Sequence, residues 1–129
     1  VVGTGSVTEE LDSDGLHSGV TNSARITIPA GGDGVYLIGG NVRWETNSSG
    51  VRVLWTEYNG SAGTGTVIAE SRIAPSGSAT QTSQLVSTVY LLASGDYVTL
   101  NVRQTSGASR DIQSAGFSAR FYALRLFSV

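Results

Sequence analysis

LVSTVYLLASGDYVTLNVRQ, residues 85 to 104, is the stretch from which the fold can be predicted. In its second half Val98, Leu100 and Val102 alternate with more polar residues, a period of two that is typical of a β-strand with one face in an apolar core. Its first half has apolar residues on both faces, so we expect that strand to be buried on both sides. The short Ala93–Asp96 corner predicts a hairpin, and so much apolar surface requires a second sheet against it.

The rest of the sequence is typical of an all-β protein. Of its 129 residues 17 are glycine, two are proline and 14% are charged, and no window has an apolar stripe at helical spacing. Further strands are predicted at residues 25–28, 35–45, 51–59, 66–73 and 117–127. Turn signals at intervals of roughly ten residues indicate a sandwich or barrel.

The alternation also predicts which face of each strand enters the core. For strand 35–45 the predicted core face consists of Tyr36, Ile38, Val42 and Trp44. For strand 51–59 it consists of Val51, Val53 and Trp55. For the last strand the better set is Tyr122, Leu124 and Leu126, and a competing assignment buries Phe121 and exposes Tyr122. The Gly39-Gly40 pair suggests a bulge or the close approach of another backbone.

Composition excludes several classes of function. The net charge is −2 and the eight basic residues, all arginine, are dispersed, so the electrostatic patch of a nucleic-acid-binding protein is missing. The lack of cysteine excludes disulfides and thiolate chemistry. No apolar run approaches the roughly 18 residues of a membrane span, and the first residues lack the features of a signal peptide. We expect a soluble chain that does not insert into membranes.

The sequence predicts an N-terminal arm followed by one domain. Residues 1–23 are polar and have too few apolar side chains to form a core. We therefore expect this arm to lie outside the sandwich and to contact a neighbouring subunit or a parent particle. The domain spans residues 24–129.

Few residues suggest a metal or catalytic site. Asp12 and Asp14 precede His17 in LDSDGLH and are the candidate metal ligands. A calcium loop needs more oxygen ligands and a distal acid, so an aspartate-capped turn is the preferred interpretation. With a single histidine and no cysteine, we expect no catalytic residue, no metal and no cofactor.

Two acids and two aromatic residues suggest carbohydrate chemistry. Glu45 and Glu57 could form the acid pair of a glycosidase, but a solvated strand end for Glu45 and an exposed arginine partner for Glu57 explain them more simply. Trp55 and Tyr58 could form a stacking platform for a sugar. Because Trp55 shares a face with Val53, we expect it in the core, which leaves Tyr58 as the candidate ligand-binding residue.

Three segments carry a resemblance to a known family. They are Ile26-Thr27-Ile28-Pro29 with Gly34-Val35-Tyr36-Leu37, then Leu92-x-x-Gly95-Asp96-x-Val98-x-Leu100-x-Val102, and finally Phe121-Tyr122-Ala123-Leu124-Arg125-Leu126. In order and spacing they resemble the complement C1q and tumour necrosis factor family of jelly-roll domains, over about residues 24–127. The Asp12–His17 run, Gly50-Val51-Arg52 and the terminal strand resemble the bacteriophage branch of that fold.

The resemblance implies a fold, an assembly and a function. The fold is a jelly-roll β-sandwich of two antiparallel sheets, and the assembly is a homotrimer. The function is that of a non-enzymatic virion structural protein, a capsid-decoration or fibre-head module whose partners are its own copies and other virion proteins. The alternative is a receptor-binding module for a host-surface glycan or protein, and a third hypothesis is a carbohydrate-active enzyme. The expected location is the virion.

The resemblance also places the strands around residues 97–104 and 117–127 at the threefold interface. Exposed aromatic residues beside small ones make sense where three copies pack around an axis. The predicted interface residues are Tyr97, Asn101, Arg103, Phe117, Phe121 and Arg125. Three like charges near an axis repel, so we expect these arginines to be paired with an acid or a carbonyl.

Overall fold

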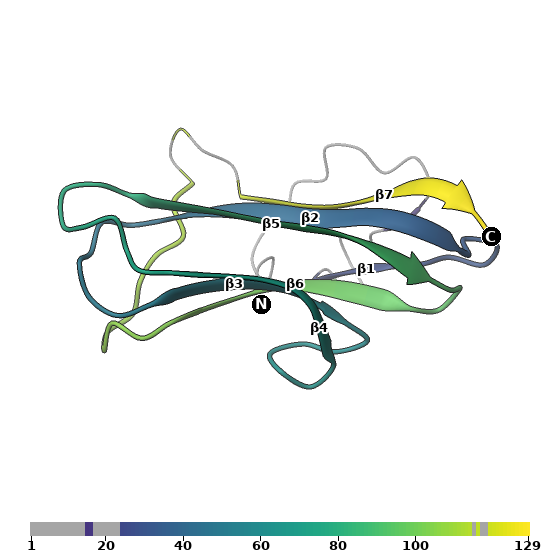
Figure 1. Ribbon diagram of the computed structural model, residues 1–129, viewed down its shortest axis with the longest axis horizontal. Helices are drawn as coiled ribbons and strands as arrows, with labels where there is room; N and C mark the ends of the chain where they lie inside the picture. Colours follow the sequence, from purple (N-terminus) through teal and green to yellow (C-terminus); the bar gives the residue numbers. More distant parts are fainter. Residues whose placement is uncertain (1–14, 17–23, 115, 117–118) are drawn as a thin grey trace.

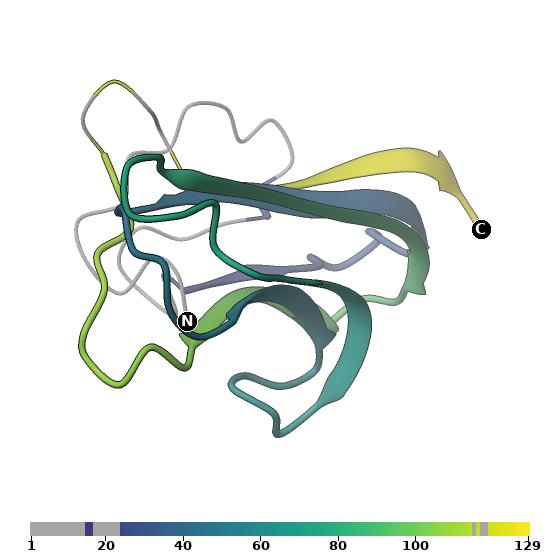
Figure 2. The ribbon, with the colours of Figure 1, turned by 60° about the vertical axis from the view of Figure 1, so that its left-hand side comes forward.

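Two antiparallel β-sheets pack face to face in the computed structural model, which describes residues 15–16, 24–114, 116 and 119–129. Over these residues the chain forms no helix and seven strands: β1 Arg25–Thr27, β2 Gly34–Trp44, β3 Arg52–Tyr58, β4 Thr66–Ile73, β5 Thr82–Leu92, β6 Tyr97–Gln104 and β7 Arg120–Ser128. One sheet has the strand order β1-β6-β3-β4 and the other β5-β2-β7. Figure 1 shows them as two layers, and the turned view in Figure 2 keeps them apart. The predicted all-β sandwich is confirmed.

The apolar core fills the space between the sheets. One cluster consists of Ile26, Ile28, Tyr36, Ile38, Leu92 and Val98, and the other of Val42, Trp44, Leu54, Val86 and Leu100. Phe121 packs against both clusters, so it links them. The predicted core faces of β2 and β6 are therefore confirmed.

Residues 85–104 do not form a hairpin, contrary to the prediction. β5 pairs with β2, whereas β6 pairs with β1 and β3, so the Ala93–Asp96 corner crosses from one sheet to the other. The Asp96 carboxylate accepts a hydrogen bond from the Ala93 N–H (2.8 Å), and the Ile28 N–H donates to the Asp96 carbonyl (2.8 Å). Two alternating strands joined by a tight corner have the same sequence pattern whether they pair or face each other across a core.

β3 presents the opposite face from the one predicted. Leu54 belongs to the core, and Arg52 and Thr56 on the same face are fully buried. Val53 and Trp55 lie on the outer face of the sheet, where they line a surface hollow. The prediction was wrong because the polar Arg52 and Thr56 occupy inward positions, which hides the true core face in the sequence.

The terminal strand β7 also faces the other way. Its pairing with β2 places Ala123 opposite the fully buried Ile38, so Phe121 and Arg125 also face the core. The exposed residues are Tyr122, Leu124 and Leu126. The competing assignment is correct, because both faces of this strand are apolar and the register with β2 decides between them.

The Gly39-Gly40 pair in β2 marks the predicted close approach of another backbone, since added Cβ atoms would lie 2.6 Å from the Val86 and Arg120 carbonyl oxygens, and also a close approach of side chains. A Cβ atom on Gly40 would lie 2.5 Å from Cδ2 of Leu100, and one on Gly39 would lie 2.5 Å from the hydroxyl oxygen of Tyr122. Leu100 reaches Gly40 from the opposite sheet, so the missing side chain allows the two layers to pack closely. The bulge of β2 lies elsewhere, near its start.

Of the predicted arm, residues 1–23, the structure describes only residues 15–16. Leu16 packs against the core, and its carbonyl accepts a hydrogen bond from the Thr27 N–H (2.7 Å). The rest of the arm, including Asp12 and Asp14, lies outside the described residues. None of the described residues forms a helix with the length and apolar character that crossing a bilayer requires.

Candidate functional site

A loop covers part of the outer face of the four-stranded sheet. Residues 59–65 connect β3 to β4 and fold back over β6. The fully buried Asn101 accepts a hydrogen bond from the Ala62 N–H (3.1 Å), and the Thr99 hydroxyl donates to the Gly60 carbonyl (2.8 Å). Ala62 has a φ of 56°, which a residue with a side chain adopts only under constraint. Polar groups of the sheet therefore hold this loop in one conformation.

Glu57 is the main anchor of that loop. Its fully buried carboxylate accepts hydrogen bonds from the N–H groups of Gly63 (2.9 Å) and Gly65 and from Nε1 of Trp55 (3.0 Å). Burial alone would raise the pKa of Glu57, but these N–H donors outweigh burial and hold the pKa below its ordinary value of 4.5. The side chain predicted to be exposed beside an arginine is instead an ionised, buried support for the loop.

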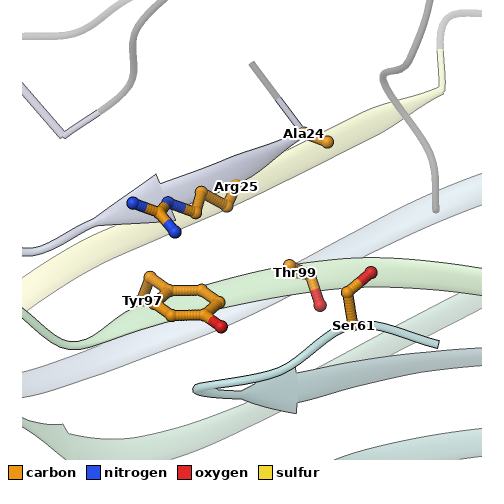
Figure 3. A pocket seen from close by; sticks show the side chains of 5 residues that line it. All are labelled: Ala24, Arg25, Ser61, Tyr97 and Thr99. Atoms are coloured by element: carbon orange, nitrogen blue, oxygen red, sulfur yellow. The ribbon is translucent and has the colours of Figure 1, made fainter. Parts of the chain in front are cut away.

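A small hollow lies on the β1 side of the loop. It has a volume of about 180 Å³ and is lined by Ala24, Arg25, Ser61, Tyr97 and Thr99, which Figure 3 shows. The Arg25 guanidinium lies 4.4 Å from the centroid of the Tyr97 ring, and its Nε donates to the Thr27 hydroxyl (3.1 Å). The cation is already engaged within the chain, so little of this hollow is free to recognise a ligand.

A larger hollow lies on the other side of the loop. It has a volume of about 340 Å³ and lies over Val53 and Trp55 of β3, between Glu70 of β4 and Arg103 of β6. The strand register places Glu70 directly opposite Trp55 and Arg103 directly opposite Val53. We call this hollow the Trp55 cleft. It combines an aromatic ring, a carboxylate and a guanidinium, a combination that can bind a polar ligand.

Tyr58, the ligand-binding candidate from the sequence, reaches neither hollow. Its ring packs against the core and against Tyr90, with 5.4 Å between the ring centroids. Its hydroxyl donates to the Asp96 carboxylate (3.1 Å), and this bond raises the pKa of Tyr58. The structure places Trp55, rather than Tyr58, on the outer face of β3 beside a hollow. The sequence does contain a signal that Trp55 lies on the outer face: the charged Glu57 shares that face of the strand with it.

The outer face of the other sheet is apolar. Its exposed large hydrophobic residues, with their exposed fractions, are Leu85 (66%), Val89 (55%), Leu91 (59%), Tyr122 (38%), Leu124 (58%), Leu126 (46%) and Phe127 (59%), and the exposed Ser83 and Ser87 of β5 share this face. The register aligns Val89, Leu37 and Leu124 in one row across β5, β2 and β7. We call the outward side chains of these three strands the three-stranded face. The second apolar face of β5, predicted to be buried, is thus exposed in the single chain.

The β6 residues predicted for the trimer interface lie on the outer face of the four-stranded sheet. Tyr97 lines the smaller hollow and Arg103 lines the Trp55 cleft. Asn101 is on the same face but fully buried beneath the loop, so it is not available for a contact between subunits. For Asn101 the interface prediction is wrong.

The β7 residues predicted for the trimer interface do not lie on the same face as the β6 residues. Phe121 and Arg125 face the core, and Arg125 donates to the Asp33 carbonyl, the kind of partner expected for it. Phe117 lies outside the described residues. β6 and β7 belong to different sheets, and the described β6 residues of this set lie on an outer face whereas Phe121 and Arg125 face the core.

Glu45 and Glu57 do not share a cleft. Glu45 follows β2 and forms an ion pair with Arg110 (3.2 Å), whereas Glu57 is buried on the outer face of the other sheet. Among the residues that the structure describes, no three His, Cys, Asp or Glu side chains form a group that could hold a metal ion.

Comparison with known proteins assigns no family. No family model matches the chain, and no curated protein matches it significantly. Function must therefore be inferred from the two outer faces of the sandwich.

Proposed function

We propose that this chain is a non-enzymatic structural protein of a bacteriophage virion, a trimeric capsid-decoration or fibre-head module with a C1q-like and tumour necrosis factor-like jelly-roll fold. The observation that carries this proposal is the apolar three-stranded face. Copies of the chain pack against one another through it, in place of the interface predicted from the sequence.

The strand order supports the jelly roll. Most successive strands of a jelly roll lie in opposite sheets, and here the chain changes sheet at every connection except that from β3 to β4. The order β1-β6-β3-β4 opposite β7-β2-β5 is the one expected for such a fold when its first strand is set aside.

The three-stranded face has the size and chemistry of a contact surface. Strands of 11, 11 and 9 residues, at about 3.4 Å per residue and about 4.8 Å apart, span roughly 500 Å². This area includes the polar residues of the face, and the largest apolar patch of a typical monomer covers about 300–600 Å² and is often functional, so the size is compatible with a contact surface. The charged residues of this face, Arg43 and Arg120, lie near one end, next to Asn41 of β2. Burying each leucine or valine contributes about 1.5–3 kcal/mol.

The oligomeric state in solution tests this proposal. Light scattering on size-exclusion chromatography should show a trimer for the wild-type chain at micromolar concentration. Leu124→Glu places a carboxylate in the central row and should give folded monomers, because the contact would desolvate an unpaired charge. Val67→Glu, at an apolar position on the outer face of the other sheet that is 47% exposed, is the matched control and should remain trimeric. A monomeric wild-type chain, or a trimeric Leu124→Glu variant, would contradict the proposal.

The virion assignment has a test of its own. An antibody against the chain should label purified particles in immunoelectron microscopy, on the head or at the fibre tip. Particles without label, or with label at scattered positions, would count against a structural role in the virion.

Receptor binding is the second candidate function, and the Trp55 cleft favours it. The cleft lies on the four-stranded sheet, on the opposite side of the sandwich from the three-stranded face. Assembly through the three-stranded face would therefore leave the cleft accessible on every copy. A host-surface glycan or protein is the partner that this function would require.

A further inference from the structure

We infer that the Trp55 cleft binds an acidic saccharide, with the sugar ring against the Trp55 indole and the carboxylate of the sugar on Arg103. The inference rests on the receptor-binding function and does not depend on assembly.

The Trp55 indole is held in place before any ligand arrives. Its Nε1–H donates to the Glu57 carboxylate (3.0 Å), and that carboxylate is itself fixed by the loop N–H groups of Gly63 and Gly65. Trp55 and Glu57 are two residues apart on one face of β3, so the bond holds the ring along the strand. A half-buried aromatic surface that is already ordered loses little entropy on binding, which favours a flat ligand face such as that of a pyranose ring.

Arg103 supplies a cation that no described residue uses. Its side chain is exposed, and it forms no ion pair with any described residue. It lies diagonally across from Trp55, because Arg103 pairs with Val53, two residues along the strand. Diagonal neighbours in an antiparallel sheet are roughly 7–8 Å apart, a distance that a sugar ring with a carboxylate substituent can bridge. A guanidinium binds a carboxylate through two parallel hydrogen bonds.

The opposite wall of the cleft completes the site. Glu70 accepts two hydrogen bonds from Arg72 (3.1 and 3.3 Å), so the charges of this pair cancel while the carboxylate oxygens remain able to accept a sugar hydroxyl. With Arg103 and the buried Glu57 added, the formal charges in and beside the cleft sum to zero. Arg103 is the one of these four groups that has no partner among the described residues, so an anionic sugar gains a contact there that a neutral sugar of the same shape cannot make.

The two tryptophans provide a direct readout by NMR. The chain has two indole N–H groups, and that of Trp44 is buried and donates to Gln84 (2.7 Å). Titration of the 15N-labelled protein with methyl glucuronide should shift the Trp55 indole signal and leave the Trp44 signal in place. Methyl glucoside, which lacks the carboxylate, should bind at least about tenfold more weakly, the loss expected for one charge-assisted hydrogen-bonded contact.

Variants at the exposed Arg103 and the half-buried Arg25 separate the site from the fold. Arg103→Gln should weaken glucuronide binding by about tenfold or more, and Arg103→Lys should restore only part of it, because lysine cannot form the two parallel bonds. Arg25→Lys, in the smaller hollow on the same sheet, is the matched control and should bind like the wild type. All three variants should keep the dispersed spectrum of a folded protein.

Three outcomes test saccharide binding at the Trp55 cleft separately from the oligomeric state. A Trp55 signal that does not move with 50 mM methyl glucuronide, in a folded protein, overturns the site. Equal binding of glucuronide and glucoside overturns the acidic class. The folded Leu124→Glu variant, whose oligomeric state light scattering reports, should bind glucuronide with wild-type affinity per chain. Loss of binding in that variant would place the site at the subunit contact and overturn the assignment to the Trp55 cleft.

Discussion

Replacing Glu57 by glutamine should destabilise the fold strongly while changing hardly any volume. The wild-type carboxylate accepts hydrogen bonds from Gly63, Gly65 and Trp55 in a fully buried position. Glutamine keeps one carbonyl oxygen and turns the other acceptor into an NH₂ group, which would face N–H donors. Hydrogen bonds to a charged group are worth about 1.5–3 kcal/mol each, so the expected loss of unfolding free energy is about 2–4 kcal/mol.

Urea unfolding and thermal melting measure this loss. For a domain of this size each kcal/mol lowers Tm by about 3 °C, so Glu57→Gln should melt roughly 6–12 °C below the wild type at pH 7. Glu70→Gln is the matched control, since Glu70 is a partly exposed acid on the same sheet face, and its loss should be below about 1 kcal/mol.

The pH dependence gives an independent check. The pKa of Glu57 is lower in the folded protein than its ordinary value of 4.5, so its contribution is complete above pH 4.5 and is lost as the pH falls through the folded value. The stability difference between wild type and Glu57→Gln should therefore be constant at neutral pH and shrink in acid. If the two proteins unfold alike at pH 7, or if their difference does not change down to pH 2, Glu57 does not anchor the loop.

Two further substitutions test the packing and the corner. Gly40→Ala should lower the free energy of unfolding by about 1–3 kcal/mol, because the new methyl group would overlap Leu100 from the opposite sheet. An unchanged urea midpoint would mean that the two sheets can move apart to accommodate a methyl group at little cost in free energy. Asp96→Ala should lower Tm at neutral pH, because the carboxylate accepts hydrogen bonds from Ala93 and Asn59. Burial raises the pKa of Asp96, but the hydrogen bonds lower it by more, so the pKa of Asp96 in the folded protein lies below its ordinary value of 3.8. The effect of Asp96→Ala should therefore fade only in strong acid. A difference from the wild type that grows in acid would refute this reasoning.

The strands themselves could be predicted from the sequence. Period-two alternation is a local property, and the turns between strands contain glycine, asparagine and aspartate residues that favour tight turns. The predicted strand 66–73 coincides with β4, and the predicted strands 35–45 and 51–59 differ from β2 and β3 by one residue at each end. Where one face was clearly the more apolar, as in β2 and β6, the inward face was also predicted correctly.

Only the tertiary structure decided which strands pair and which face of β3, β5 and β7 enters the core. Alternation says which residues share a face, but not which face turns inward when both are apolar or when a loop covers the outer one. Pairing with β2 turned Phe121 inward and left Leu124 exposed, and the loop held by Glu57 buried the outer side of β3 while leaving Trp55 at a cleft. Contacts between residues far apart in the chain settle these choices, so the two surfaces from which function is proposed could not be read from local pattern.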